Sequence, residues 1–185
     1  VTGVQTCALP ISSVQVPALT TAQVATITSG QIQALTLRQV ADLTTRQAQA
    51  LTTGQLRALT TVQVRALETE DLRALTTAQM QALHTASLAA LTTQQFAAVT
   101  TAQLVVLTTE QVVALTPTQI SALTTAQAGA LVTGQVAALT TAQVVALETA
   151  DLQALTTAQL VVLSSSQIAA LSLNQVAALT SLQAQ

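Results

Sequence analysis

The chain has 185 residues, of which 50% are hydrophobic, 6% are charged and 1% are aromatic, and its formal net charge is −2. It lacks the high charge of disordered segments, and its weak acidity argues against nucleic acid as a partner. No apolar run approaches the roughly 20 residues of a membrane-spanning helix, so we expect no membrane insertion.

Residues 1–11, VTGVQTCALPI, open the chain and closely resemble the translation of a sequencing-library adapter. The resemblance implies that this stretch is foreign to the natural protein. The alternative is a genuine terminal cap or a truncated signal peptide, but the stretch has neither a basic region nor a long apolar core. If it is foreign, the single cysteine, Cys7, does not bear on disulfides or zinc.

From residue 12 to residue 185 one eight-residue unit recurs without insertion or deletion, as in residues 139–146, LTTAQVVA. We name its first, second, fifth, sixth and eighth positions the Leu, cap, Gln, aliphatic and Ala positions. The third is usually Thr, and the fourth and seventh vary. A unit this short cannot bury an apolar face alone, so the copies must stack. We therefore expect residues 12–185 to form a single solenoid, truncated at both ends.

The cap and Gln positions together read Thr-x-x-Gln, which is the pattern of a helix capping box. The Leu and aliphatic positions on either side match a hydrophobic staple. Pro117 directly follows Thr116, where a proline suits the first helical residue. We predict an all-α fold, an α-solenoid of very short capped helices, one per repeat. The cap is lost or altered where its position holds one of four other residues: Glu68, His84, Val132 and Glu148.

Two other folds compete with this prediction. In one continuous helix the Leu row would drift by about 80° per copy, so no seam could form. In a β-solenoid, the alternative fold class, alternation would place the Leu position opposite the aliphatic and Ala positions. Turn residues are also too few for its corners. The number of copies per coil stays open, although cap departures on alternate copies hint at antiparallel helix pairs and a 16-residue unit.

Arginines are the only basic residues other than His84, since the chain has no lysine. Arg38 and Arg46 share the fourth position, and Arg57, Arg65 and Arg73 share the seventh. If successive copies stack directly, the last three form a column that could bind an anionic polymer. The alternative is a solvated edge, which the glutamines at the same position continue.

The other candidates for chemistry are few. We interpret Glu68, Glu70 and Asp71 as surface capping carboxylates rather than a catalytic pair, because acid–base work needs a cleft that perturbs their pKa values. His84 has no His, Cys or acidic cluster around it. We therefore predict no catalytic residue, no cofactor and no metal site. From residue 89 to residue 171 the seventh position is largely Val or Ala, which could form a lateral contact surface or reflect drift.

The consensus Ala-Leu-Thr-Thr-Ala-Gln-Val-Ala resembles the octapeptide repeat stretches of large bacterial repeat proteins, which are presumed to be exported. The resemblance covers residues 12–185 and implies no enzyme activity and no functional residues. We expect a non-enzymatic array that acts as a rigid stalk or spacer in a larger surface or secreted protein, located outside the cell or on its surface. The alternative is a periodic binding surface for a polysaccharide, a protein or another polymer.

Overall fold

A computed structural model of the chain describes residues 15–179, so the adapter-like residues 1–11 and Cys7 lie outside the described residues. Within the described range the regular structure consists of twenty α-helices of four to six residues, with no strand. The predicted all-α fold is confirmed. The helices are α1 (Thr21–Thr26), α2 (Ser29–Ala34), α3 (Leu37–Ala41), α4 (Thr45–Ala50), α5 (Thr53–Ala58), α6 (Thr61–Arg65), α7 (Thr69–Ala74), α8 (Thr77–Ala82), α9 (Thr85–Ala90), α10 (Thr93–Ala97), α11 (Thr101–Leu104), α12 (Thr109–Val113), α13 (Pro117–Ile120), α14 (Thr125–Ala130), α15 (Thr133–Ala138), α16 (Thr141–Ala146), α17 (Thr149–Ala154), α18 (Thr157–Leu160), α19 (Ser165–Ala169) and α20 (Leu173–Ala178).

Most of the described helices begin at the capping box that the sequence predicts. In α16 the Thr140 Oγ1 accepts from the backbone N–H of Gln143 at 3.2 Å, and the Thr140 N–H donates to Gln143 Oε1 at 2.8 Å. These two bonds satisfy two of the N–H groups that a helix start otherwise leaves without a partner. The side-chain cap bond is missing at the four departures listed above, as expected.

The chain passes from one helix to the next through two extended residues. At the junction of α5 and α6, Leu59 has φ −60° and ψ 132°, and Thr60 has φ −70° and ψ 159°. Ordinary L-residues adopt these angles without strain. No described residue has a positive φ. The corner therefore needs no glycine, which explains why the repeat contains none in its consensus.

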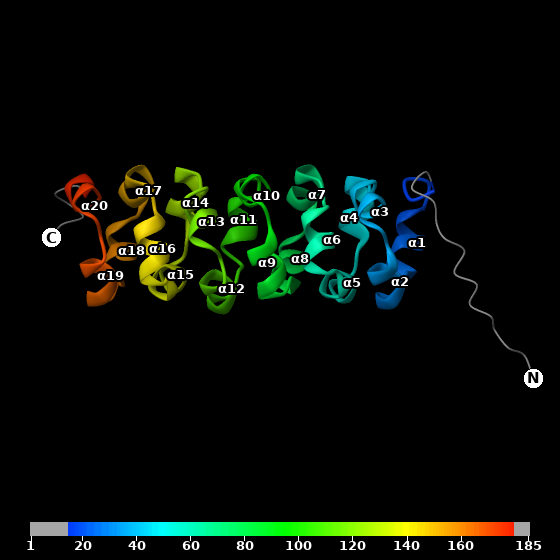
Figure 1. Ribbon diagram of the computed structural model, residues 1–185, viewed down its shortest axis with the longest axis horizontal. Coiled ribbons are helices and arrows are strands. Elements are labelled where there is room, and N and C mark those ends of the chain that lie inside the picture. Colours follow the sequence, from blue (N-terminus) through cyan, green and yellow to red (C-terminus); the bar gives the residue numbers. More distant parts are fainter. Residues whose placement is uncertain (1–14, 180–185) are drawn as a thin grey trace, which may run out of the picture.

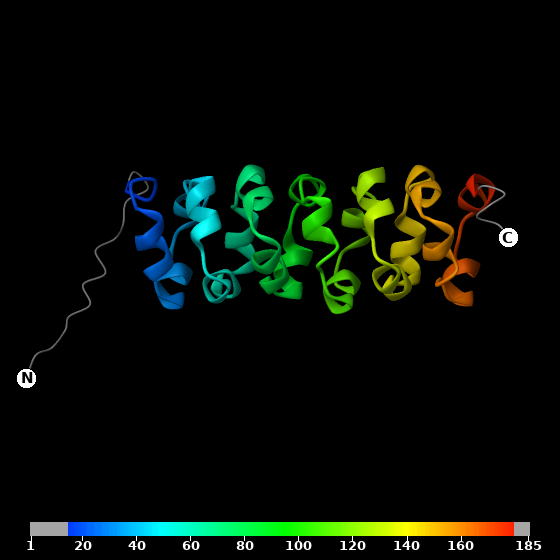
Figure 2. The same ribbon diagram turned by 180° about the vertical axis from the view of Figure 1, so that it is seen from behind.

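The helices wind into a straight rod (Figures 1 and 2). Each helix packs on the third helix along the chain, as α4 does on α7 and α14 on α17. In Figure 1, α7, α10, α14 and α17 follow one another along one edge, with α5, α12 and α15 along the opposite edge. The hinted antiparallel pairing of consecutive helices is therefore wrong for the described residues.

The Leu and aliphatic positions fill one continuous core that runs inside the rod from Val16 to Leu160. The core side chains of Phe96 and Met80 are 0% exposed. Helices of four to six residues are unstable in isolation because nucleation is costly. Burial against neighbouring coils supplies the stability that each helix lacks alone.

Candidate interaction surface

The glutamine of each repeat lies inside the rod rather than on its surface. Gln119 is 1% exposed, and its Oε1 accepts from the Thr116 N–H at 2.9 Å, which is the capping-box bond. Its Nε2 donates to Leu88 O at 2.8 Å and to Leu91 O at 2.9 Å. Both carbonyls lie at the C-terminal end of α9, four helices back along the chain. One side chain thus joins the start of one helix to the end of another.

The same bridge recurs along the rod, and we call it the glutamine ladder. Its side chains reach carbonyls 28 to 31 residues back. Each helix packs on the third helix along the chain, and each ladder glutamine bonds to the end of the fourth helix back. One coil therefore takes between three and four helices. The glutamines of the ladder are Gln47, Gln55, Gln63, Gln79, Gln95, Gln103, Gln111, Gln119, Gln127, Gln135, Gln143, Gln159, Gln167 and Gln175.

The sequence analysis assigned these glutamines to capping alone and missed their role between coils. The signal that could have revealed it is the complete absence of Glu from the Gln position. A capping box accepts Glu as readily as Gln. Only the carboxamide also carries N–H donors, so the use of Gln and never of Glu indicates that a donor is needed.

Asp71 and Asp151 replace the glutamine in two copies, and both are buried, at 4% and 3% exposure. The Oδ2 atom of each has no hydrogen-bond partner. Burial, together with the charges of Glu68 and Glu70, raises the pKa of Asp71 from 3.8 to about 6. Burial also raises the pKa of Asp151. The interpretation of Asp71 as a surface carboxylate is therefore wrong.

Arg57, Arg65 and Arg73 are exposed and lie on α5, α6 and α7. Because a coil takes between three and four helices, these successive helices follow an arc around the rod and not a line along it. The Arg57 Nε donates to Ala82 O at the end of α8, at 3.3 Å. Gln153 makes the corresponding bond to Ala178 O, at 2.8 Å. Long side chains at the seventh position can thus satisfy a helix C-terminus, while anion binding by the arginines stays a prediction.

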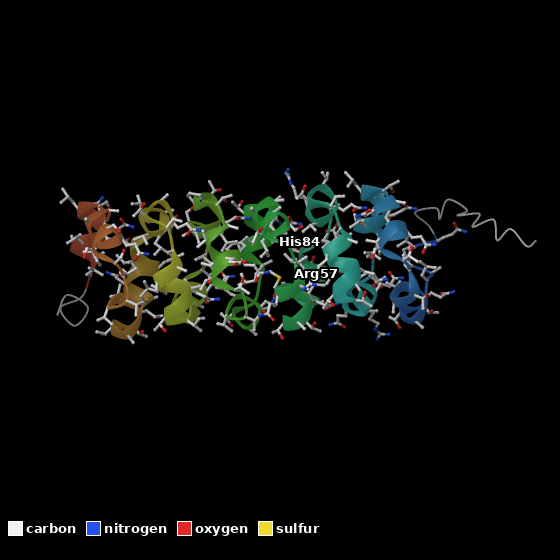
Figure 3. All side chains as sticks on the ribbon, turned by 90° about the horizontal axis from the view of Figure 1, so that it is seen from below. Arg57 and His84 are labelled. Carbon is white, nitrogen blue, oxygen red and sulfur yellow. The ribbon has the colours of Figure 1, made fainter. Side chains whose placement is uncertain are left out.

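His84 is the exposed residue before the first turn of α9, and its side chain makes no cap bond. Figure 3 shows it near the middle of the rod. Within the described residues no group of three or more His, Cys, Asp or Glu side chains could hold a metal ion. Arg38 is held by Asp42 in an ion pair of 3.0 Å on one helix. These side chains form no constellation that resembles a catalytic site.

Further along the rod the seventh position turns apolar, as the sequence shows. Val113, Val145 and Val161 are 45%, 48% and 72% exposed. They lie on α12, α16 and the end of α18, where they are among the exposed apolar groups of the described rod that a lateral partner could meet.

Comparisons with known proteins agree with the repeat architecture. A family model described as the ALTTAQ repeat matches residues 64–101, 83–117, 95–125, 112–141 and 144–181. No curated protein matches the chain, and neither does any solved structure. Across residues 15–179, no helix has both the length and the apolar character that crossing a bilayer requires.

Proposed function

The chain belongs to the ALTTAQ repeat family, and from its continuous rod we propose that it is a non-enzymatic spacer, a rigid stalk in a larger bacterial surface or secreted protein. The observation that supports this most directly is that a continuous hydrophobic core and the glutamine ladder both join successive coils. The core resists bending because every coil packs on the next. The ladder adds directional bonds that fix the rotation of one coil against its neighbour.

A spacer must also be adjustable in length, and the repeat allows this. Each copy uses the same caps, the same corner and the same ladder bonds, so whole copies can be added or lost without a change in packing. The stability of such arrays is a sum of copy and nearest-neighbour terms. Selection for reach can therefore act on copy number alone.

Small-angle X-ray scattering tests this proposal. We expect the chain to scatter as a stiff rod, and a variant in which residues 100–155, seven whole copies, are duplicated should lengthen in proportion to its added copies. As a control, a duplication of residues 100–151 adds six and a half copies and therefore breaks the repeat register. A maximum dimension that does not grow with whole copies, or a flexible scattering profile, would reject the stiff spacer.

The second candidate function is binding of an anionic polymer, and the exposure of Arg57, Arg65 and Arg73 on successive helices favours it. Joint replacement of the three by Gln should abolish a salt-sensitive interaction with heparin or polyphosphate, because each arginine contributes a screened charge. Arg38→Gln is the matched control, since this arginine is already paired with Asp42. Retention of binding by the triple variant would eliminate this function.

A further inference from the structure

Two copies interrupt the glutamine ladder in the same way. In the repeat register, the carbonyls that a glutamine at position 71 would reach are those of Val40 and Leu43, 31 and 28 residues back, as in the ladder bonds of Gln79. The corresponding carbonyls for position 151 are those of Ile120 and Leu123. Asp71 and Asp151 put a carboxyl group where every ladder residue has an N–H donor.

The local packing at both places differs from the rest of the rod. The aliphatic position of the helix packed beneath each aspartate holds Ala48 or Ala128, which are the smallest side chains at that position in the described core. The contacts of α4 with α7 and of α14 with α17 are the most extensive in the rod. A shorter acidic side chain and a closer approach of the helices therefore occur together, twice.

The chemistry at the Gln position depends on protonation. A carboxylate only accepts hydrogen bonds, so it has no proton to offer to a carbonyl oxygen. A neutral carboxylic acid has one O–H donor and could bond such a carbonyl, as the carboxamide does in other copies. Leaving a charged group buried and unpaired destabilises the fold.

We propose that Asp71 and Asp151 make two seams of the rod sensitive to pH: as neutral acids they donate to the carbonyls of the preceding coil, and as carboxylates they offer those carbonyls no donor. Acidic conditions close the two seams and alkaline conditions loosen them. The rod then bends or opens at these two defined places.

The charged groups around each aspartate reinforce this behaviour. On α7 and its cap the described charges are Glu68, Glu70 and Arg73. Arg46 lies on α4, Arg38 and Asp42 lie on α3 and at its end, and α10 carries no charge. Desolvation and the two glutamates raise the pKa of Asp71 to about 6. For Asp151, desolvation and then Glu148 raise the pKa, while bonds from the Glu148 backbone and Thr125 oppose the rise. The helices α13, α14 and α20 bring no charge to that site.

The sign of the effect follows from these directions. A carboxyl group whose pKa is raised on folding contributes its full stability below its ordinary value, and loses it as the pH rises through the folded value. With 3.8 and about 6 for Asp71, the folding equilibrium constant should fall roughly 50-fold between pH 4 and pH 8. Asp151 should change it in the same direction.

The test compares urea unfolding of the full chain with that of the double variant Asp71→Gln, Asp151→Gln from pH 4 to pH 8. We expect the wild-type midpoint to fall with pH, and the double variant to be more stable at pH 8 with a much flatter profile. Both substitutions restore the consensus residue, so the variant should fold. Glu110→Gln, an exposed carboxylate in the first turn of α12, is the matched control and should leave the fall in place.

Carboxyl-carbon NMR gives a second readout, which does not depend on unfolding. Two aspartate resonances should titrate above the ordinary range in the wild-type chain and disappear in the double variant. A wild-type midpoint that stays flat or rises with pH would overturn the proposal. So would a fall that survives in the double variant, or aspartates that all titrate near 3.8.

Discussion

Replacement of Gln119 by Met measures how much the glutamine ladder stabilises the rod. Methionine has a similar length and fills the same buried space, but it neither accepts the Thr116 N–H nor donates to Leu88 O and Leu91 O. Leu88 O keeps the bond from the Leu91 N–H at 3.2 Å. The Thr116 N–H and Leu91 O lose their hydrogen-bond partners, and this loss sets the size of the effect.

The expected destabilisation follows from these losses. A net hydrogen bond contributes about 1 kcal/mol, and each buried group left without a partner costs about 1–3 kcal/mol. Two such groups and the lost bond to Leu88 O give a total on the order of 3–7 kcal/mol for Gln119→Met. The control is Gln31→Met. Gln31 is exposed and makes the same capping bond, from the Thr28 N–H at 2.9 Å, with no described bond to another coil.

Urea unfolding followed by far-UV circular dichroism checks this pair of variants. Gln31→Met should cost about 1 kcal/mol or less, because it removes only a cap interaction at the end of the described rod. Gln119→Met should shift the midpoint several times further. Equal shifts for the two variants would refute our reasoning, since the cross-coil bonds would then add nothing beyond capping.

Three further predictions use the same unfolding assay. Gly134→Ala should stabilise the chain by about 0.5–1 kcal/mol, because an added Cβ meets nothing within 4 Å. Gly129→Ala should give no such stabilisation, because its Cβ would lie 3.1 Å from Ala154 O. Equal gains would contradict the close approach of α14 and α17. Val132→Thr should add a side-chain cap bond to α15 and stabilise the chain by about 0.5–1 kcal/mol. An unchanged unfolding midpoint would argue against this gain. Phe96→Ala should cost about 3–5 kcal/mol as it empties a fully buried site; a smaller loss would mean that the core collapses into the space.

Much of the local structure could be predicted because its bonds join residues within one repeat. The cap bond between Thr140 and Gln143 spans three residues, and Pro117 marks a helix start by its own chemistry. The same holds for the core. The Leu and aliphatic positions flank each cap, so they lie on one side of every helix and face the interior together. No information from distant parts of the chain is needed for either inference.

The candidate surface was predicted less well. The seventh position was recognised as exposed, yet its arginines were expected to align by direct stacking of successive copies. Their actual placement depends on the rotation between helices, which Leu59 and Thr60 set through their extended backbone angles. Asp71 was mistaken for a surface group, because part of its environment is made by α4, which precedes it by three copies.

The sequence by itself therefore determined the helices, their caps and the residues of the core, since an eight-residue period contains all the partners for these features. Only the tertiary structure decided that a coil takes between three and four helices, and that each ladder glutamine reaches 28 to 31 residues back. Near-identical copies contain no mark that tells one stacking partner from another. The choice comes from the angle at each corner and from the packing of side chains in the shared core, and both exist only once several coils have formed.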